Sequence, residues 1–349
     1  MDALISPRRR SLLIGALGSA ALAACQRPGS PSDGRVHLSG ETMGSTYNVK
    51  LDPAGHAVEQ LSAAVDATLQ AVDQRMSMFR PESELSAFNA ASSGVPVPLS
   101  AELFGVLAVA QDVSRWSAGA FDVTVAPAVE TWGFGVAKRR VVPATREVAR
   151  QRAHVDWRGL RLHAAQRTAT KARAGLQADL GGIAKGYGVD AVARTLDELG
   201  IVHYMVEVGG EVRARGVNGA GAAWQIGVEQ PDAVPQRARY VVPLAGRAMA
   251  TSGDYRNYFE QDGRRYSHEI DPVTAAPIAH RLCSATVVAD DCIRADAIAT
   301  ALIVLGPERG YALAEASGIA AHFIERSAPG RFSDRMTPAF AALGARFVG

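Results

Sequence analysis

The sequence has little of several residue types, and each shortage excludes a class of protein. Only three of its 349 residues are cysteine, which excludes a small fold held together by disulfides. Its 37 basic and 35 acidic residues leave a net charge of +2, so we expect no nucleic-acid partner. Lysine is scarce, and the four lysines are Lys50, Lys138, Lys171 and Lys185. A lysine inside a motif is therefore a candidate functional residue.

The rest of the composition is that of a globular protein. The hydrophobic fraction is 48% and the charged fraction 21%, which excludes general disorder. The length favours one large domain or two intimate subdomains. After residue 25, no stretch approaches the roughly twenty apolar residues that span a bilayer, so the body of the protein is expected to be soluble.

The first residues are typical of an export signal. Arg8, Arg9 and Arg10 precede an apolar run over 11–24 that is shorter than a membrane span. The run ends in Leu22-Ala23-Ala24-Cys25, which resembles a bacterial lipobox. We therefore predict a lipoprotein signal peptide over 1–24, of the Sec or the twin-arginine type, and a lipidated Cys25. The alternative is an ordinary signal peptide whose cysteine is incidental.

This interpretation predicts the organisation and the location of the chain. A flexible tether rich in glycine, proline and serine covers 25–36, and one folded domain covers 37–349. The protein is expected in the bacterial cell envelope, facing the periplasm and attached to the membrane by its lipid.

Hydrophobic periodicity predicts a mixture of strand clusters and separate helices. Helices are expected over 57–76, 83–89, 99–117, 181–199 and, after a turn, within 290–305. Strands are expected over 36–51, 121–125, 160–174, 202–217, 223–229 and 239–250, while 139–155 is interpreted as a connecting segment. No repeating strand–helix–strand pattern is present, so the fold class is α+β.

Two segments carry candidate ligand-binding residues. In 179–187, two glycines precede Lys185 at an expected helix start, where backbone groups and an ammonium can approach a phosphate. In 295–300, Asp296 and Thr300 lie four residues apart on one helix face and could offer two oxygens to Mg²⁺. The alternatives are a glycine packing device and a solvated helix face.

Other polar residues leave open alternatives. His268, before an Asp-Pro turn, could bind a ligand or move a proton, although a structural role is the more common one. Gly209 and Gly210 interrupt a strand pattern, which indicates a bulge or a close approach of a ligand. Cys283 and Cys292 are either two buried thiols or, in an oxidising compartment, a disulfide.

Taken together and in order, eight segments resemble the ApbE family, the FAD:protein FMN transferases. They are 41–47, 76–89, 119–124 with 132–135, 179–187, 206–211, 251–255, 268–272 and 295–300. The resemblance implies a single large α+β flavinyltransferase domain of the T-fold-related type, with two intimate subdomains.

The resemblance also implies an activity. Members of this family use Mg²⁺ to transfer the FMN moiety of FAD to a Ser or Thr hydroxyl of a target flavoprotein, forming a phosphoester and releasing AMP. The implied partners are FAD and an acceptor with an FMN-binding domain, either a subunit of a membrane redox complex or an exported flavoprotein. Two alternatives remain, namely a Mg²⁺-dependent FAD pyrophosphatase and a non-catalytic FAD-binding lipoprotein.

The resemblance assigns roles to residues of this chain. Metal binding falls to Asp296, Thr300 and a backbone carbonyl that we place at Gly182. Contacts with FAD fall to Met43, Phe79, Ala120, Phe121, Asp122, Asp179, Lys185 and His268. The base that accepts the proton of the acceptor hydroxyl stays open between His268 and Asp296.

Two positions depart from the family pattern. Phe79 stands where a tyrosine is common, so one hydrogen bond to FAD is expected to be missing. Ala275 stands where a glycine is usual, and we expect that it does not adopt a positive φ, so that the local turn differs.

Overall fold

Eight strands from distant parts of the chain form one antiparallel sheet, in the order β1-β2-β6-β7-β10-β15-β16-β17. The computed structural model describes residues 34–328 and 330–349. The predicted signal peptide and Cys25 lie outside the described residues. The strands of this sheet are β1 (Val36–Thr42), β2 (Ser45–Leu51), β6 (Tyr204–Val208), β7 (Glu211–Arg215), β10 (Ala248–Gly253), β15 (Leu282–Ala289), β16 (Ala320–Ala328) and β17 (Arg331–Met336).

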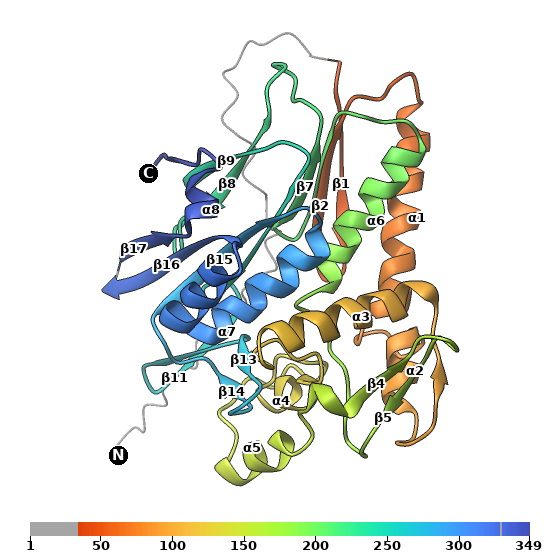
Figure 1. Cartoon of the computed structure of the whole chain (residues 1–349), viewed down its shortest axis with the longest axis vertical. Helices are drawn as coiled ribbons and strands as arrows, with labels where there is room; N and C mark the ends of the chain where they lie inside the picture. Colours follow the sequence, from red (N-terminus) through yellow and green to blue (C-terminus); the bar gives the residue numbers. More distant parts are fainter. Residues whose placement is uncertain (1–33, 329) are drawn as a thin grey trace, which may run out of the picture.

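Three long helices pack on one face of this sheet (Figure 1). They are α1 (Val58–Met76), α6 (Ala184–Glu198) and α7 (Cys292–Ala316). In α1 the buried side chains recur every three or four residues, at Leu61, Val65, Leu69, Val72 and Met76, and form a single apolar stripe. Helix α7 changes direction at Gly306, whose φ of 82° is outside the helical region.

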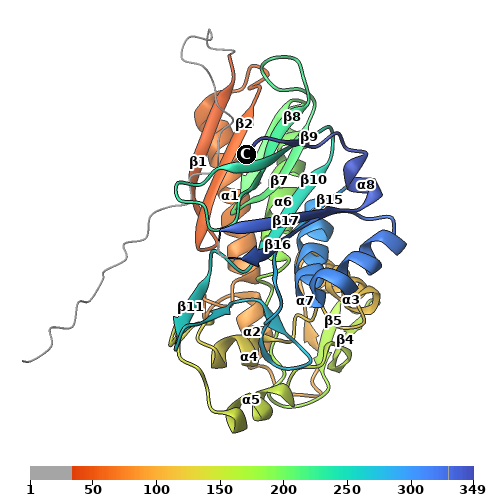
Figure 2. The same cartoon turned by 90° about the vertical axis from the view of Figure 1, so that its left-hand side faces the viewer.

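A second, smaller sheet packs against the other face. It has the order β18-β9-β8, formed by β8 (Trp224–Glu229), β9 (Ala238–Leu244) and β18 (Arg346–Phe347). Trp224, Ile226 and Val242 share a core with Val212 and Met249 of the large sheet. Figure 2 shows this second layer from the side, with the short helix α8 (Pro338–Ala341) next to it.

The remaining elements form the lower half of the molecule in Figure 1. The helices are α2 (Glu84–Ala90), α3 (Ala101–Trp116), α4 (Ala126–Thr131), α5 (Thr145–Arg152) and the 3₁₀ helix η1 (Trp157–Gly159). The strands are β3 (Val97–Pro98), β4 (Leu160–His163), β5 (Thr168–Lys171), β11 (Tyr258–Gln261), β12 (Arg264–Ser267), β13 (Ile270–Asp271) and β14 (Ala276–Pro277). One core cluster joins α1, α2 and α3 to residues of α6 and α7, so both halves share these long helices.

The predicted α+β class is confirmed, and most predicted elements occur. Three predictions of local structure were wrong. Residues 121–125 form turns rather than a strand, with a single bridge from Val125 to Gln177. The supposed connection 139–155 contains α5, and the single strand expected over 239–250 is two strands, β9 and β10, in different sheets.

The two C-terminal cysteines do not pair. Cys283 and Cys292 are free, buried thiols that belong to different core clusters. Burial raises the pKa of the Cys283 thiol to about 12, which favours the protonated form. Among the helices of residues 34–328 and 330–349, none is both long and apolar enough to cross a membrane.

Candidate active site

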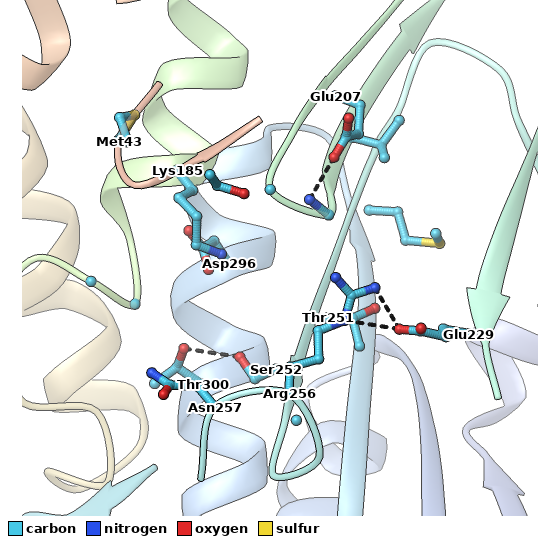
Figure 3. A pocket seen from close by; sticks show the side chains of 18 of the residues that line it. Met43, Lys185, Glu207, Glu229, Thr251, Ser252, Arg256, Asn257, Asp296 and Thr300 are labelled. Carbon is cyan, nitrogen blue, oxygen red and sulfur yellow. Dashed lines mark hydrogen bonds and ion pairs between the residues drawn. The ribbon is translucent and has the colours of Figure 1, made fainter. Parts of the chain in front are cut away.

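One cavity of about 1700 Å³ opens beside the N-terminal ends of α6 and α7. All the residues that the sequence singled out for metal, FAD or catalysis line it: Met43, Phe79, Ala120, Phe121, Asp122, Asp179, Gly182, Lys185, His268, Asp296 and Thr300. Figure 3 shows Met43, Lys185, Asp296 and Thr300 together with side chains from the opposite wall. The fold therefore joins residues as far apart in the sequence as Met43 and Thr300.

A close crossing of α6 and α7 places Asp296. Gly186 permits the crossing, since a Cβ there would lie 2.3 Å from the carbonyl oxygen of Cys292 and 2.8 Å from the Cβ of Asp296. The Gly186 N–H donates to Asp296 Oδ2 over 2.9 Å. Asp190 of α6 accepts from the N–H groups of Cys292 and Ile293, each at 2.9 Å, and so caps α7. The Asp296 carboxylate is thereby fixed at the start of α6.

Three residues that can offer oxygen ligands line the cavity next to this crossing, namely Gly182, Asp296 and Thr300. Thr300 lies one turn after Asp296 on α7, and its hydroxyl is 3.0 Å from Ser252 Oγ. The backbone at Gly182 approaches the same hydroxyl, since a Cβ there would lie 2.9 Å from Thr300 Oγ1. A carboxylate, a hydroxyl and a backbone carbonyl are hard ligands that suit Mg²⁺.

These donors fit a magnesium ion that is completed by other groups. Within the described parts of the chain, no three His, Cys, Asp or Glu side chains gather in a way that could hold a metal by themselves. Mg²⁺ is typically bound by one or two carboxylates together with phosphates and water. The residues Gly182, Asp296 and Thr300 therefore fit an ion that arrives with a phosphorylated ligand.

Lys185 provides the positive charge of the site. Its Nζ lies 2.6 Å from Oε1 of Glu211, a residue of β7 that is 1% exposed. Burial alone would lower the pKa of Lys185, but Glu211, Asp296 and Glu269 together raise it above its ordinary value. The ammonium is therefore charged at neutral pH and available to a phosphate.

Buried carboxyl groups surround this ammonium. Burial raises the pKa of Glu269 to about 8, with Asp296 adding to the shift and Lys185 opposing it. Burial likewise raises the pKa of Asp296, which is 2% exposed, above its usual range. A cation bound near Asp296 would favour the charged form of this carboxyl group.

His268 is neutral and half-buried between β12 and β13. Burial and the charge of Lys185 lower its pKa to about 4. Its Nδ1 is 3.1 Å from the carbonyl oxygen of Asn257, which favours the tautomer that donates from Nδ1 and leaves Nε2 as an acceptor, 3.7 Å from Glu269 Oε1. A neutral imidazole with Nε2 as an acceptor can take a proton. The other candidate base, Asp296, already accepts a hydrogen bond from the Gly186 N–H.

Asp122 and Asp179 line the cavity but also hold its walls. The Asp122 carboxylate accepts from the N–H and hydroxyl of Thr124, each at 2.7 Å, and from the N–H of Trp157 at 2.9 Å. Asp179 accepts from the N–H of Gly181 at 2.7 Å and shapes the turn before α6. Both carboxylates therefore position backbone, whatever they contact in a ligand.

The apolar lining comes from short loops. Met43, with φ of 51°, occupies the β1–β2 turn and packs towards α6. Phe121 is buried, whereas Phe79, after α1, is 54% exposed at the edge of the cavity. An exposed ring at this place can stack on a flat ligand.

Two details of the sequence interpretation were wrong. Gly209 and Gly210 form the tight turn between β6 and β7 rather than a strand interior, because Val208 pairs with Glu211 across them. A Cβ at Gly209 would lie 3.1 Å from Lys185 Cδ, and both glycines line the cavity, so a close approach of a ligand to them stays a prediction. Ala275 does adopt a positive φ, 53°, so the turn keeps the conformation that glycine favours.

Sequence reasoning missed several residues of the site. Glu211 and Glu269 are buried carboxyl groups beside Lys185, and Ser252 bonds to Thr300. Arg256 pairs with Glu229 at 2.5 Å on the far wall (Figure 3). Glu211, Ser252 and Glu269 lie inside the motif segments, which was the available signal. Their partners are far away in the sequence, and spacing alone does not identify them.

Comparison with known proteins places this geometry in a family. The model of the ApbE family matches residues 43–323. A Vibrio cholerae protein named FAD:protein FMN transferase is 43% identical over 313 residues, which cover 89% of this chain and 92% of that protein. A Haemophilus influenzae protein of the same name is 41% identical, over 92% of this chain and 94% of its own length.

Solved structures agree with these sequence matches. The apo form of the flavinyl transferase ApbE from Pseudomonas stutzeri superposes with a TM-score of 0.81. It is 40% identical, and the match covers 88% of this chain and 96% of that one.

Proposed function

The chain belongs to the ApbE family, and on that basis we propose that it is an enzyme that transfers the FMN moiety of FAD to a protein. The observation that carries the proposal is the assembly of Gly182, Asp296, Thr300 and Lys185 in one cavity. The acceptor is a Ser or Thr hydroxyl of a flavoprotein, the product is a phosphoester and the leaving group is AMP.

The size of the cavity supports a dinucleotide substrate. Pockets for drug-sized ligands are about 300–1,000 Å³. The cavity here, at about 1700 Å³, has room for FAD and for a segment that presents a hydroxyl group. Its lining combines apolar side chains from the loops with the charged groups at the starts of α6 and α7.

The chemistry requires charge to be stabilised on phosphate oxygens. The new bond joins the acceptor oxygen to the phosphorus of the FMN half, and the bond from that phosphorus to the AMP oxygen breaks. A magnesium ion held by Gly182, Asp296 and Thr300 would supply charge neutralisation on the diphosphate. Lys185 adds a fixed ammonium next to it.

His268 is the residue that we assign as general base. Its neutral form suits it to take the proton of the acceptor hydroxyl, and so does its Nε2, whose neighbour Glu269 Oε1 lies beyond hydrogen-bond distance at 3.7 Å. Asp296 is less suited, because one of its oxygens accepts from Gly186 and its carboxylate is assigned to the metal. Phe79 and Phe121 would contact the flat rings of FAD.

The test uses the purified full-length chain with FAD, Mg²⁺ and a candidate FMN-binding domain. Intact masses and in-gel flavin fluorescence should show one FMN added to the acceptor, and nothing after EDTA or after Ser/Thr→Ala replacement in the acceptor. FMN and AMP released without labelling of any acceptor in a panel would identify a pyrophosphatase. Bound FAD without turnover would identify a flavin carrier and contradict the proposal.

The location of the protein is a further part of this proposal. We place it in the bacterial envelope, facing the periplasm and anchored through a lipid on Cys25. Support comes from the resemblance of residues 22–25 to a lipobox.

A further inference from the structure

Lys185 lies among three buried carboxyl groups but contacts one of them. Glu211, Asp296 and Glu269 are 1%, 2% and 7% exposed, and all three act electrostatically on the ammonium. Lys185 Nζ is 2.6 Å from Glu211 Oε1. The fold has therefore selected one of several possible partners for a flexible side chain.

The β6–β7 hairpin makes this selection. Gly209 has no Cβ and lets the Lys185 stem pass, since a Cβ would lie 3.1 Å from Lys185 Cδ. Val208 pairs with Glu211 and closes the turn, which fixes the Glu211 backbone. Glu211 Oε2 is buried and, among the described residues, has no hydrogen-bond partner. The ion pair with Lys185 is thus the polar contact that offsets the cost of burying this carboxylate.

A released ammonium would have an alternative partner close by. Lys185 directly precedes Gly186, whose N–H donates to Asp296 Oδ2, so the lysine stem starts beside the Asp296 carboxylate. Figure 3 shows the two side chains next to each other. An ammonium paired with Asp296 would occupy the oxygens that the proposed function reserves for the metal.

We propose that Glu211 is a positioning residue that holds the Lys185 ammonium away from Asp296, so that Asp296 stays available to the metal ion. This inference rests on the proposed metal-binding role of Asp296. Glu211 contacts neither the metal nor the substrate in this scheme and acts through Lys185. The same pair leaves the ammonium at the cavity wall, where it meets the phosphate of FAD.

The variant Glu211→Asp separates position from charge. It keeps the negative charge but removes one methylene, so the carboxylate no longer reaches Lys185 at 2.6 Å. If Glu211 influenced the metal site through its charge alone, metal binding would survive this change, because the charge stays nearly in place. A positioning role would not survive it, because Lys185 is released towards Asp296.

The experiment measures metal affinity directly. The purified full-length chain, saturated with FAD so that the diphosphate completes the site, is titrated with Mn²⁺ as a probe for the Mg²⁺ site, and free Mn²⁺ is read by electron paramagnetic resonance. Glu211→Asp is compared with wild type, and the same change is made in a Lys185→Met background. We expect the substitution to weaken Mn²⁺ binding about fivefold or more when Lys185 is present, and by less than about twofold when it is absent.

Three controls make each outcome decisive. Glu207→Asp shortens a buried carboxylate on the neighbouring strand that binds Asn48 and Gly210, and it should leave Mn²⁺ affinity unchanged. Asp296→Asn tests the metal assignment itself, and thermal unfolding checks that each variant folds. Wild-type affinity in Glu211→Asp, or the same loss in both backgrounds, would overturn the inference.

The two proposals fail in different ways. If Asp296→Asn binds Mn²⁺ as tightly as wild type, or wild type binds none, the metal assignment is wrong and the inference falls with it. If Asp296→Asn loses Mn²⁺ while Glu211→Asp keeps it, the inference alone is wrong.

Discussion

Individual side chains at this site combine a proposed functional role with a structural one. Asp296 accepts from Gly186 and is assigned to the metal, while Thr300 bonds to Ser252 and approaches Gly182. Substitutions must therefore be chosen so that one role is removed at a time.

Asp296→Ala should abolish Mg²⁺-dependent turnover. It removes the one carboxylate of the proposed metal set, so a loss of at least about a hundredfold in turnover is expected. FAD binding, measured by the quenching of flavin fluorescence, should survive, because the other lining residues are unchanged. Wild-type turnover in this variant would exclude Asp296 as a metal ligand.

Thr300→Val and Thr300→Ser form a matched pair. Valine replaces the hydroxyl by a methyl group of similar size, whereas serine keeps the hydroxyl. The Mg²⁺ concentration for half-maximal turnover should rise about tenfold in Thr300→Val and stay near wild type in Thr300→Ser. Equal behaviour of the two variants would remove the Thr300 hydroxyl from the metal set.

Glu269 should make stability fall as pH rises. Burial raises its pKa from 4.5 to about 8, so the folded state binds a proton that the unfolded state releases. Its contribution is complete below pH 4.5 and is lost as pH rises through 8. Between pH 5 and 8, the free energy of unfolding of wild type should fall by about 1–4 kcal/mol relative to Glu269→Gln.

Urea unfolding at both pH values measures this difference. Glu198→Gln, at the C-terminal end of α6 and exposed, is the control and should follow wild type. The assignment is wrong if Glu269→Gln also follows wild type across the range.

At the scale of elements, the site depends on how closely α6 and α7 approach each other. Gly186 leaves the space for this contact, and the Asp190 carboxylate ties α6 to the first turn of α7. Helix α7 carries both Asp296 and Thr300, so its position relative to the start of α6 determines the spacing of the oxygens.

Gly186→Ala should disrupt this contact, and Gly188→Ala should not. The first substitution puts a Cβ 2.3 Å from the Cys292 carbonyl oxygen, so the backbones must separate, at a cost of at least about 2 kcal/mol of stability. In the second, the nearest atom is Met43 Sδ at 3.4 Å, an ordinary contact. Alanine is also more favourable than glycine inside a helix, so the stability of Gly188→Ala should stay within about 1 kcal/mol of wild type.

Chemical unfolding and turnover measured side by side check this pair. Gly186→Ala should lose activity together with stability, since Asp296 moves with α7. Equal stability of the two alanine variants would show that the helices can separate at no cost.

At the scale of the whole molecule, the cavity lies at the junction of all layers. The large sheet, the helices on one face, the small sheet on the other and the lower loops each contribute lining residues. No single layer contains the site, so the site forms only in the complete fold.

The proposed membrane anchor belongs to this scale as well. Cys25→Ala should move the protein from the membrane fraction to the soluble periplasmic fraction, because Cys25 is the proposed attachment point of the lipid. FMN transfer to an isolated acceptor domain should be unchanged, since Cys25 is far outside the family match at 43–323. A variant that remains in the membrane fraction would refute lipidation at this residue.

The α+β class, most helices and the residues that meet in the cavity follow from the amino-acid sequence alone. Periodicity identified α1 and α3 because each buries one regular stripe, and the ordered motifs identified Asp296, Thr300 and Lys185. It did not show the break between β9 and β10 or the helix α5, whose residues are all at least partly exposed and follow no apolar pattern.

The partners and charges of these residues depend on how the folded chain packs. The partner of Lys185 is Glu211 rather than Asp296 because a glycine turn brings β7 beside α6. The lowered pKa of His268 and the raised pKa of Glu269 come from burial, which no local pattern contains. A motif specifies which groups are present. The distances between these groups and their burial arise only when distant segments pack, and they fix the charge and the partners of each group.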